Sequence, residues 1–260
     1  MPTITEKKPT TFTELLDTIE EFQGSNDVAW YRGIADATYK LEPSLFRHPT
    51  KKTIEEIARL EAEVTTRFVQ RSVPFLSRTL TDDWDKLFLM QHFGVPTRLL
   101  DWSENPFIGA YFALTGNPKR KSSDAVLWMC NPAKWNRGVL QHVSYDGGVL
   151  DESSDKIRYF RPATDLEEMP NYAVMIYGTY NSARIVAQRG GFSLFGKGLD
   201  PLEKAYRAGT FEDGILQKVI IKRDLVADLR DSLLRKGITE SVVFPDLDGL
   251  SKEIRRMFGF

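Results

Sequence analysis

The sequence predicts an α+β fold, with a single domain whose mostly antiparallel sheet is flanked by N-terminal helices. Apolar residues at helical spacing dominate the first part of the chain, and strand-like apolar runs dominate the later part. The regular βαβ alternation of a doubly wound fold is absent. No repeat, low-complexity tract or linker divides the 260 residues. We therefore expect an N-terminal extension and helix over residues 1–24 and the main domain over residues 25–260.

The helices are predicted from apolar stripes that start at capping residues. Thr13 is the expected N-cap of the first helix, and Thr81 or Asp82 the expected cap of the third. Pro106 suits the first turn of the fourth helix, because its missing N–H costs nothing there. The predicted helices cover residues 12–24, 53–75, 82–93, 107–114, 224–235 and a terminal segment from 247.

The strands are predicted from short apolar runs bounded by turn-forming residues. A polar stretch from about residue 138 to 170 is expected to be a loop or small excursion, and loops this long in compact domains often form lids or binding loops. The predicted strands cover residues 28–32, 97–102, 125–130, 173–177, 184–187, 216–221 and 240–244.

The composition excludes several classes of protein. The 35 Lys+Arg against 36 Asp+Glu give a net charge of −1, which argues against a non-specific nucleic-acid coat but leaves room for a local basic cleft. The one cysteine, Cys130, excludes an intramolecular disulfide framework and is expected to be a buried apolar residue. No apolar run suits a signal peptide or a membrane span, so we expect a soluble, cytoplasmic protein without a membrane partner. Common catalytic motifs are absent and the three histidines lack ligand spacing, so no metal is expected.

An arginine at the end of a predicted strand, Arg32, is followed by Gly33. A guanidinium is a rigid fork for phosphate or carboxylate, and the glycine would let a ligand approach the backbone. The alternative is that Arg32 pairs with an internal carboxylate such as Asp101 or Glu104. The ring of the preceding Tyr31 is suited either to stacking on a nucleotide base or to core packing.

A second informative stretch, residues 91–102, reads QHFGVPTRLLDW. Its Arg98 has the same two interpretations, with an Arg98–Asp101 pair as the plainer one. His92 follows an amphipathic helix, which favours a hydrogen-bonded packing residue over a general base. Trp102 suits either ligand stacking or the core.

These stretches occur in an order that resembles the FRG domain family. WYRG at residues 30–33 and the long QHFGVPTRLLDW motif are followed by QRGGF at 188–192 and FPDLDG at 244–249. The resemblance extends from about residue 25 to 255, so residues 25–260 are expected to be an FRG-like domain.

The same order is similar, more distantly, to that of the arginine-class mono-ADP-ribosyltransferases, which suggests a fold like theirs. Those enzymes begin with an aromatic-Arg-Gly strand, continue with a Ser- or Thr-bearing strand and an A-x-x-F helix, and end on a strand with a catalytic glutamate. The resemblance implies that Arg32 holds the phosphates and ribose of NAD⁺ as substrate and that Ser103 supports its nicotinamide half. The glutamate would stabilise an oxocarbenium-like transition state. Gln188 stands where the glutamate is expected, and Glu240, which opens the predicted strand at 240–244, could supply the charge from a neighbouring strand. The residues implied to contact NAD⁺ are Tyr31, Arg32, Gly33, His92, Arg98, Asp101 and Trp102.

Two functions follow from these resemblances. The first is an NAD⁺-dependent ADP-ribosyltransferase-like enzyme that modifies a macromolecular acceptor, protein or nucleic acid, as a bacterial or phage-conflict toxin or antiviral defence effector, with an inhibitor or antitoxin as a further partner. It predicts that Arg32 and Glu240 converge on one pocket. The second is a non-catalytic nucleotide- or nucleic-acid-sensing module in which Arg32, Arg98 and Arg184 grip phosphates. It predicts an open basic groove.

Overall fold

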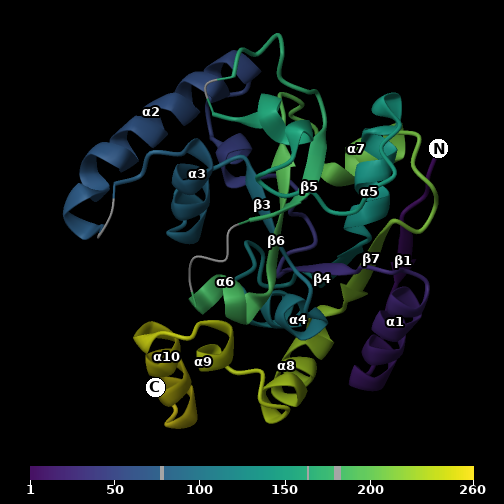
Figure 1. The fold of residues 1–260 in the computed structure, drawn as a ribbon. Helices are drawn as coiled ribbons and strands as arrows, with labels where there is room; N and C mark the ends of the chain where they lie inside the picture. The colour runs from purple at the N-terminus through teal and green to yellow at the C-terminus, as the bar shows by residue number, and fades with distance from the viewer. Residues whose placement is uncertain (77–78, 163, 179–182) are drawn as a thin grey trace.

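The fold is built on one seven-stranded sheet with helices on both of its faces, as the computed structural model shows (Figure 1). The structure describes residues 1–76, 79–162, 164–178 and 183–260. The strand order is β1-β7-β4-β2-β3-β6-β5, and all neighbouring pairs are antiparallel except β1–β7. The predicted α+β class with a mostly antiparallel sheet is therefore confirmed.

The strands are three to six residues long, and most of the helices are short. The strands are β1 Thr5–Lys7, β2 Trp30–Ile34, β3 Leu99–Ser103, β4 Ala125–Cys130, β5 Ala173–Tyr177, β6 Gly190–Phe195 and β7 Leu216–Ile221. The helices are α1 Phe12–Gly24, α2 Ile54–Ser72, α3 Asp83–His92, α4 Pro106–Thr115, α5 Pro132–Val139, α6 Ala183–Gln188, α7 Leu202–Ala208, α8 Val226–Arg235, α9 Glu240–Val243 and α10 Leu247–Met257. A 3₁₀ turn, η1, covers Ser44–Arg47.

The helices with clear apolar stripes lie where the sequence predicts them. The long helix is capped by Thr53, whose side chain accepts from the Glu56 amide in a capping box. Asp82 caps α3 as expected. The cap of α1 is Thr11 rather than Thr13, because the Thr11 side chain accepts from the amide of Glu14.

Two predicted strands are wrong. Residues 184–187 lie in helix α6, and residues 240–244 contain helix α9, so Glu240 opens a helical turn and not a strand. Short runs that contain Val and Ile suit both structures, and only their tertiary contacts decide. The strand expected before Gly33 instead continues through it to Ile34. β1, α5 and α7 are not predicted; they are three, eight and seven residues long, and such short segments contain few repeats of a strand or helix pattern.

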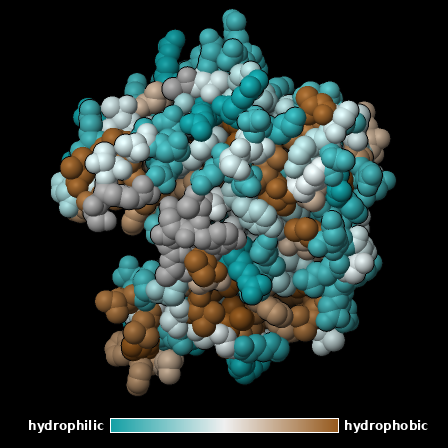
Figure 2. Space-filling model, in the orientation of Figure 1, coloured by the Kyte–Doolittle hydropathy of each residue, from teal (hydrophilic) through white to brown (hydrophobic). Residues whose placement is uncertain are grey.

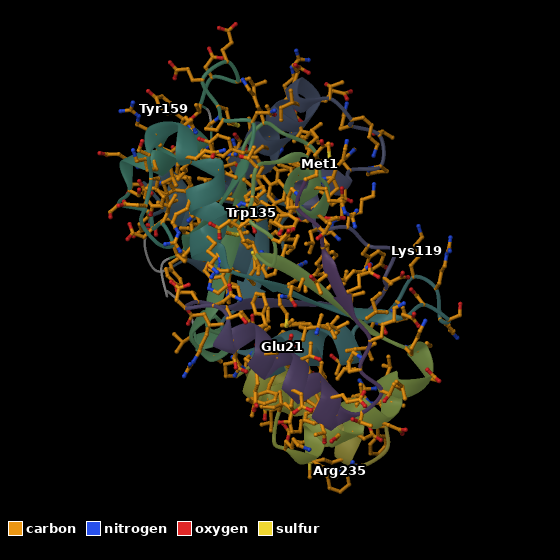
Figure 3. All side chains as sticks on the ribbon, turned by 90° about the vertical axis from the view of Figure 1, so that its right-hand side faces the viewer. Met1, Glu21, Lys119, Trp135, Tyr159 and Arg235 are labelled. Atoms are coloured by element: carbon orange, nitrogen blue, oxygen red, sulfur yellow. The ribbon has the colours of Figure 1, made fainter. Side chains whose placement is uncertain are left out.

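The core lies on both faces of the sheet. On one face, Tyr31 and its β4 and β7 neighbours pack against α1. On the other, Trp30, Trp102 and Trp135 share a cluster with residues of η1, α2 and α7. Trp135 lies near the centre of Figure 3, and its indole N–H donates to the Ala173 carbonyl at 2.9 Å. Cys130 is fully buried in this cluster, and burial raises the pKa of its thiol.

The sheet opens between β2 and β3. The two strands share a single residue pair, Tyr31 with Ser103, whereas β2 pairs with β4 over five residues. Beyond Tyr31 the strands separate, so the next residue of β2, Arg32, lies where ladder hydrogen bonds would otherwise form. This opening creates the candidate site.

Candidate functional site

A cleft of about 660 Å³ lies beside the opening between β2 and β3. Its walls come from η1, β2, α3, β3, α4, the end of α6 and the start of α10. Most of the predicted site residues line it, although they are distant in sequence. They are Tyr31, Arg32, Gly33, His92, Asp101, Trp102, Ser103 and Gln188. Two predicted site residues, Arg98 and Glu240, do not line it.

Arg32 bridges the two separated strands. Its Nη1 donates to the backbone carbonyl of Asp101 at 2.6 Å and lies 3.9 Å from Oδ2 of the same residue. The side chain is 20 % exposed, and its buried Nε has no hydrogen-bond partner among the described residues. Burial lowers the pKa of Arg32, Asp101 opposes that shift and the nearby Arg47 adds to it. The expected contact with Asp101 is thus present, mainly through the backbone, and the guanidinium still borders the cleft.

A hydrogen-bond network explains the polar residues of the QHFGVPTRLLDW motif. The Gln91 amide donates to Oδ2 of Asp101 at 2.8 Å, and its carbonyl oxygen accepts from the Thr97 hydroxyl. The amide of Thr97 in turn donates to Oγ of Ser44 at 3.2 Å. The network ties α3, β3 and η1 together around Arg32. His92, the last residue of α3, lines the cleft and contacts the ring of Phe93.

Arg98 is a core residue, and neither the predicted Arg98–Asp101 pair nor a phosphate-binding role fits its surroundings. Its Nε donates to both carboxylate oxygens of Glu61, at 2.8 and 3.0 Å. Nη1 donates to the Phe195 carbonyl at 2.6 Å, and Nη2 to the Phe160 carbonyl at 2.7 Å. The guanidinium is buried, and each of its three nitrogens donates to a carboxylate or carbonyl oxygen. The side chain of Arg184, the other predicted phosphate contact, lies outside the described residues.

Gly33 serves packing rather than ligand approach. A Cβ at this position would lie 1.9 Å from the carbonyl oxygen of Gly109 and 2.4 Å from the Ala113 amide nitrogen, both in α4. The absence of a side chain therefore allows α4 to sit directly on β2, and the expectation that the glycine admits a ligand is corrected.

The two candidate stacking rings belong to the core. Trp102 is buried, and its indole N–H donates to Oγ of Ser193 at 2.7 Å. Tyr31 is buried against α1, and burial raises its pKa to about 12. Each ring contributes to packing beside the cleft.

Ser103 and Gln188 join the cleft to the C-terminal helices. The Ser103 hydroxyl donates to the Gln188 carbonyl and accepts from the Asn105 amide, which starts α4. The Gln188 side chain donates to the carbonyl of Val243 in α9 at 3.1 Å. Both polar groups therefore hold backbone segments in position around the cleft.

Glu240 lies away from the cleft, contrary to the predicted convergence with Arg32. Its two carboxylate oxygens accept from Nε of Arg256 at 2.9 and 3.0 Å. Both residues line a different depression, between α4, α8 and α10. Residues 240–243 form a helical turn, so Glu240 does not lie on a strand of the sheet beside the cleft.

Three further charged residues line the cleft and were not predicted as site residues. Arg47 ends η1 and is exposed, and it forms no ion pair with any residue that the structure describes. Asp246 and Asp248 lie at the start of α10. Asp246 is the N-cap, as its sequence position indicates, and accepts from the Gly249 amide at 2.7 Å. The charge of these residues does not by itself indicate a binding site in the sequence, because most charged residues lie on solvated surfaces.

The cleft consequently carries both charges. The guanidinium groups of Arg32 and Arg47 come from β2 and η1. Of the carboxylates, that of Asp101 comes from β3 and lies beside Arg32, and those of Asp246 and Asp248 come from the start of α10. In Figure 2 the outline of the molecule is notched between the region of α2 and α3 and the region of α10, with apolar side chains on both sides. In the part of the chain that is described, no group of three or more His, Cys, Asp or Glu could hold a metal ion.

Comparison with models of known protein families gives one match. The family model of the FRG domain matches residues 27–122, which contain β2, η1, α2, α3, β3 and α4. The predicted resemblance is confirmed over that range. No curated protein and no solved structure matches the chain. Among the described residues, no helix has the length and apolar character that a membrane crossing requires.

Proposed function

We propose that this chain, which carries an FRG domain over residues 27–122, binds NAD⁺ in the cleft beside Arg32 and transfers its ADP-ribosyl group to a macromolecular acceptor. The observation that supports this is the division of charge in the cleft. Two arginines from β2 and η1, with the Asp101 carboxylate beside Arg32, and two aspartates from α10 suit a ligand that is itself charged in both senses.

The cationic side suits a diphosphate. Guanidinium groups bind phosphate oxygens through paired, charge-assisted hydrogen bonds, which are stronger than neutral ones. Arg32 is held in place by the Asp101 carbonyl, so little conformational entropy is lost when it binds. Arg47 is exposed and supplies a second guanidinium at the cleft.

The anionic side suits the nicotinamide end of NAD⁺. The oxidised nicotinamide ring carries a positive charge, whereas the ring of NADH and the free ribose of ADP-ribose do not. The carboxylates of Asp246 and Asp248, both exposed at the cleft, attract that charge. A cleft with only arginines would not distinguish these ligands in this way.

The proposed transfer breaks the bond between the ribose C1″ and the nicotinamide nitrogen, whose electron pair leaves with neutral nicotinamide. An acceptor heteroatom then bonds C1″ and loses its proton to solvent or to a nearby base. A carboxylate beside the positive ribose in the transition state lowers the barrier. Within this proposal we assign that role to Asp248, which lines the cleft, rather than to Glu240, which pairs with Arg256.

The binding step is tested by calorimetry with NAD⁺, NADH and ADP-ribose. We expect NAD⁺ to bind most tightly and Arg47→Ala to weaken all three about tenfold, the loss of one charge-assisted contact. Asp248→Asn is expected to weaken NAD⁺ selectively. Arg207→Ala, at an exposed position of α7, is the matched control. Equal affinity for NAD⁺ and NADH, or no saturable binding at millimolar NAD⁺, would contradict the proposal.

The chemical step is tested with NAD⁺ labelled in its adenylate phosphate, added with the protein to a cell extract. Label on a macromolecule and release of nicotinamide, both lost in Asp248→Asn, would support transfer. Release without label would make the protein an NAD⁺ hydrolase. Bound but intact NAD⁺ would favour the second candidate, a nucleotide-sensing module, which the position of Glu240 outside the cleft also favours.

A further inference from the structure

We propose that an apolar groove along α2 docks a segment of a partner protein that has an apolar face and acidic flanks. The docked protein would be the acceptor that is modified, and this part of the inference rests on the proposed function. The groove itself is independent of that function.

The groove is large and apolar. It measures about 1,220 Å³, above the range of about 300–1,000 Å³ that is usual for small-molecule sites. Its floor includes Leu60, Val64 and Phe68 of α2, and its edges include Phe75 and Phe93, which are 86 % and 65 % exposed. In Figure 2, apolar side chains are visible over the α2 region. Contiguous exposed apolar surface of this kind marks an interaction site.

The groove follows from how α2 packs. Ile57 and Glu61 are buried against the body of the protein. Leu60, Val64 and Phe68 recur every four residues on a neighbouring stripe of the helix and are only half-buried, Leu60 by packing against the core. A stripe with this spacing is the surface that an amphipathic segment recognises.

The rim of the groove indicates the charge of the partner. Three exposed charged residues of α2 line it, Glu63, Arg67 and Arg71, so the arginines outnumber the carboxylate, and neither arginine forms an ion pair with a described residue. Carboxylates beside the apolar face of a partner would complement them and would favour that partner over a basic one. Surfaces that bind nucleic acids are more polar and more positively charged than this groove.

The groove is continuous with the cleft. Phe93 and Val95, which follow α3, line both. A polypeptide seated along α2 would therefore bring its neighbouring residues to the mouth of the cleft, next to Arg47. This continuity is what makes a docked protein an acceptor in the proposed reaction.

The test uses fluorescence anisotropy with a synthetic helical peptide of about 18 residues, with leucines at positions i, i+3, i+4 and i+7 and glutamates on both flanks. A second peptide replaces the glutamates with lysines. We expect saturable binding of the glutamate peptide and at least about tenfold weaker binding of the lysine peptide. Val64→Asp is expected to abolish binding, whereas Leu250→Asp, at an exposed apolar position of α10, leaves it unchanged.

Several results would overturn the inference: no saturation by the glutamate peptide, equal binding of both peptides, or normal binding to Val64→Asp. Displacement of the peptide by a single-stranded RNA would identify a nucleic-acid surface instead. Circular dichroism of each variant shows that the fold is retained. The peptide assay contains no NAD⁺, so it can succeed where the proposed function fails. If the extract assay shows transfer, Val64→Asp should reduce labelling of acceptor protein without changing the affinity for NAD⁺.

Discussion

Replacing Glu61 by leucine is expected to destabilise the protein strongly, because Glu61 neutralises the buried guanidinium of Arg98. In the native protein Arg98 makes two contacts to this carboxylate and donates one hydrogen bond to each of two backbone carbonyls. Glu61→Leu leaves the positive charge buried with only the carbonyls as partners. Removing one member of a buried ion pair costs about 3–5 kcal/mol. The two retained carbonyl contacts place the expected loss near the lower value, at about 3 kcal/mol.

The loss is measurable by thermal and urea unfolding followed by circular dichroism. For the 260-residue chain the unfolding entropy is about 0.5 kcal/mol/K, so Tm should fall by about 5–6 °C. Glu63→Leu, on the exposed surface of the same helix, should stay within about 0.5 kcal/mol of the native protein. In the double variant Glu61→Leu with Arg98→Met, part of the stability should return, because no charge is then buried unpaired. A shift of less than about 1 °C for Glu61→Leu would refute the reasoning.

Three further predictions concern single residues. Trp102→Ala should lower the free energy of unfolding by about 3–5 kcal/mol in urea titrations, because it empties a core position and removes the bond to Ser193; an unchanged urea midpoint would mean that the ring is not core. Gly33→Ala should reduce the yield of folded protein or lower Tm markedly, since its Cβ would overlap Gly109, and a normal Tm would show that α4 can move away from β2. Hydrogen bonds from neighbouring side chains and amides hold the pKa of the buried Asp36 well below its usual range despite the opposing effect of burial. Its contribution to stability is therefore fully present above about pH 4, the unfolded pKa, and is lost as the pH falls toward the lower folded pKa. The Asp36→Asn variant should have a lower free energy of unfolding at neutral pH, and that free energy should fall less steeply as the pH is lowered. If it falls equally steeply in the variant and the native protein, Asp36 does not make this contribution.

The parts of the fold that the sequence predicts well are those in which local pattern and tertiary environment agree. Helix α1 has a continuous apolar stripe, and β4 is a fully apolar run that is buried on both faces. The sequence predicts strands where helices α6 and α9 lie, because segments of four to six residues that contain β-branched residues suit either structure. Their helical form depends on contacts such as the bond from Gln188 to Val243, which no local pattern contains.

The candidate site shows the same division. Arg32 and the QHFGVPTRLLDW segment are recognisable from local motifs, and the structure brings them together at the opening between β2 and β3. Arg47, Asp246 and Asp248 reach the same cleft only through the folding of η1 and α10 around it. Arg98 belongs to the same motif as Asp101 but has a structural role, since it is buried against α2. A motif can therefore locate a site without separating the residues that contact a ligand from those that support them.

Because Arg32 contacts the backbone of Asp101, the charge at position 101 can change without a change in the position of Arg32. The guanidinium is anchored to a carbonyl oxygen that every amino acid possesses, whereas the Asp101 carboxylate lies 3.9 Å away and is largely exposed. Substitution of Asp101 by a neutral residue of similar size can therefore alter the electrostatic potential while the arginine keeps its anchor. A substitution at Asp101 can thus change the electrostatic potential of the cleft through one exposed side chain, without rebuilding the sheet that holds Arg32.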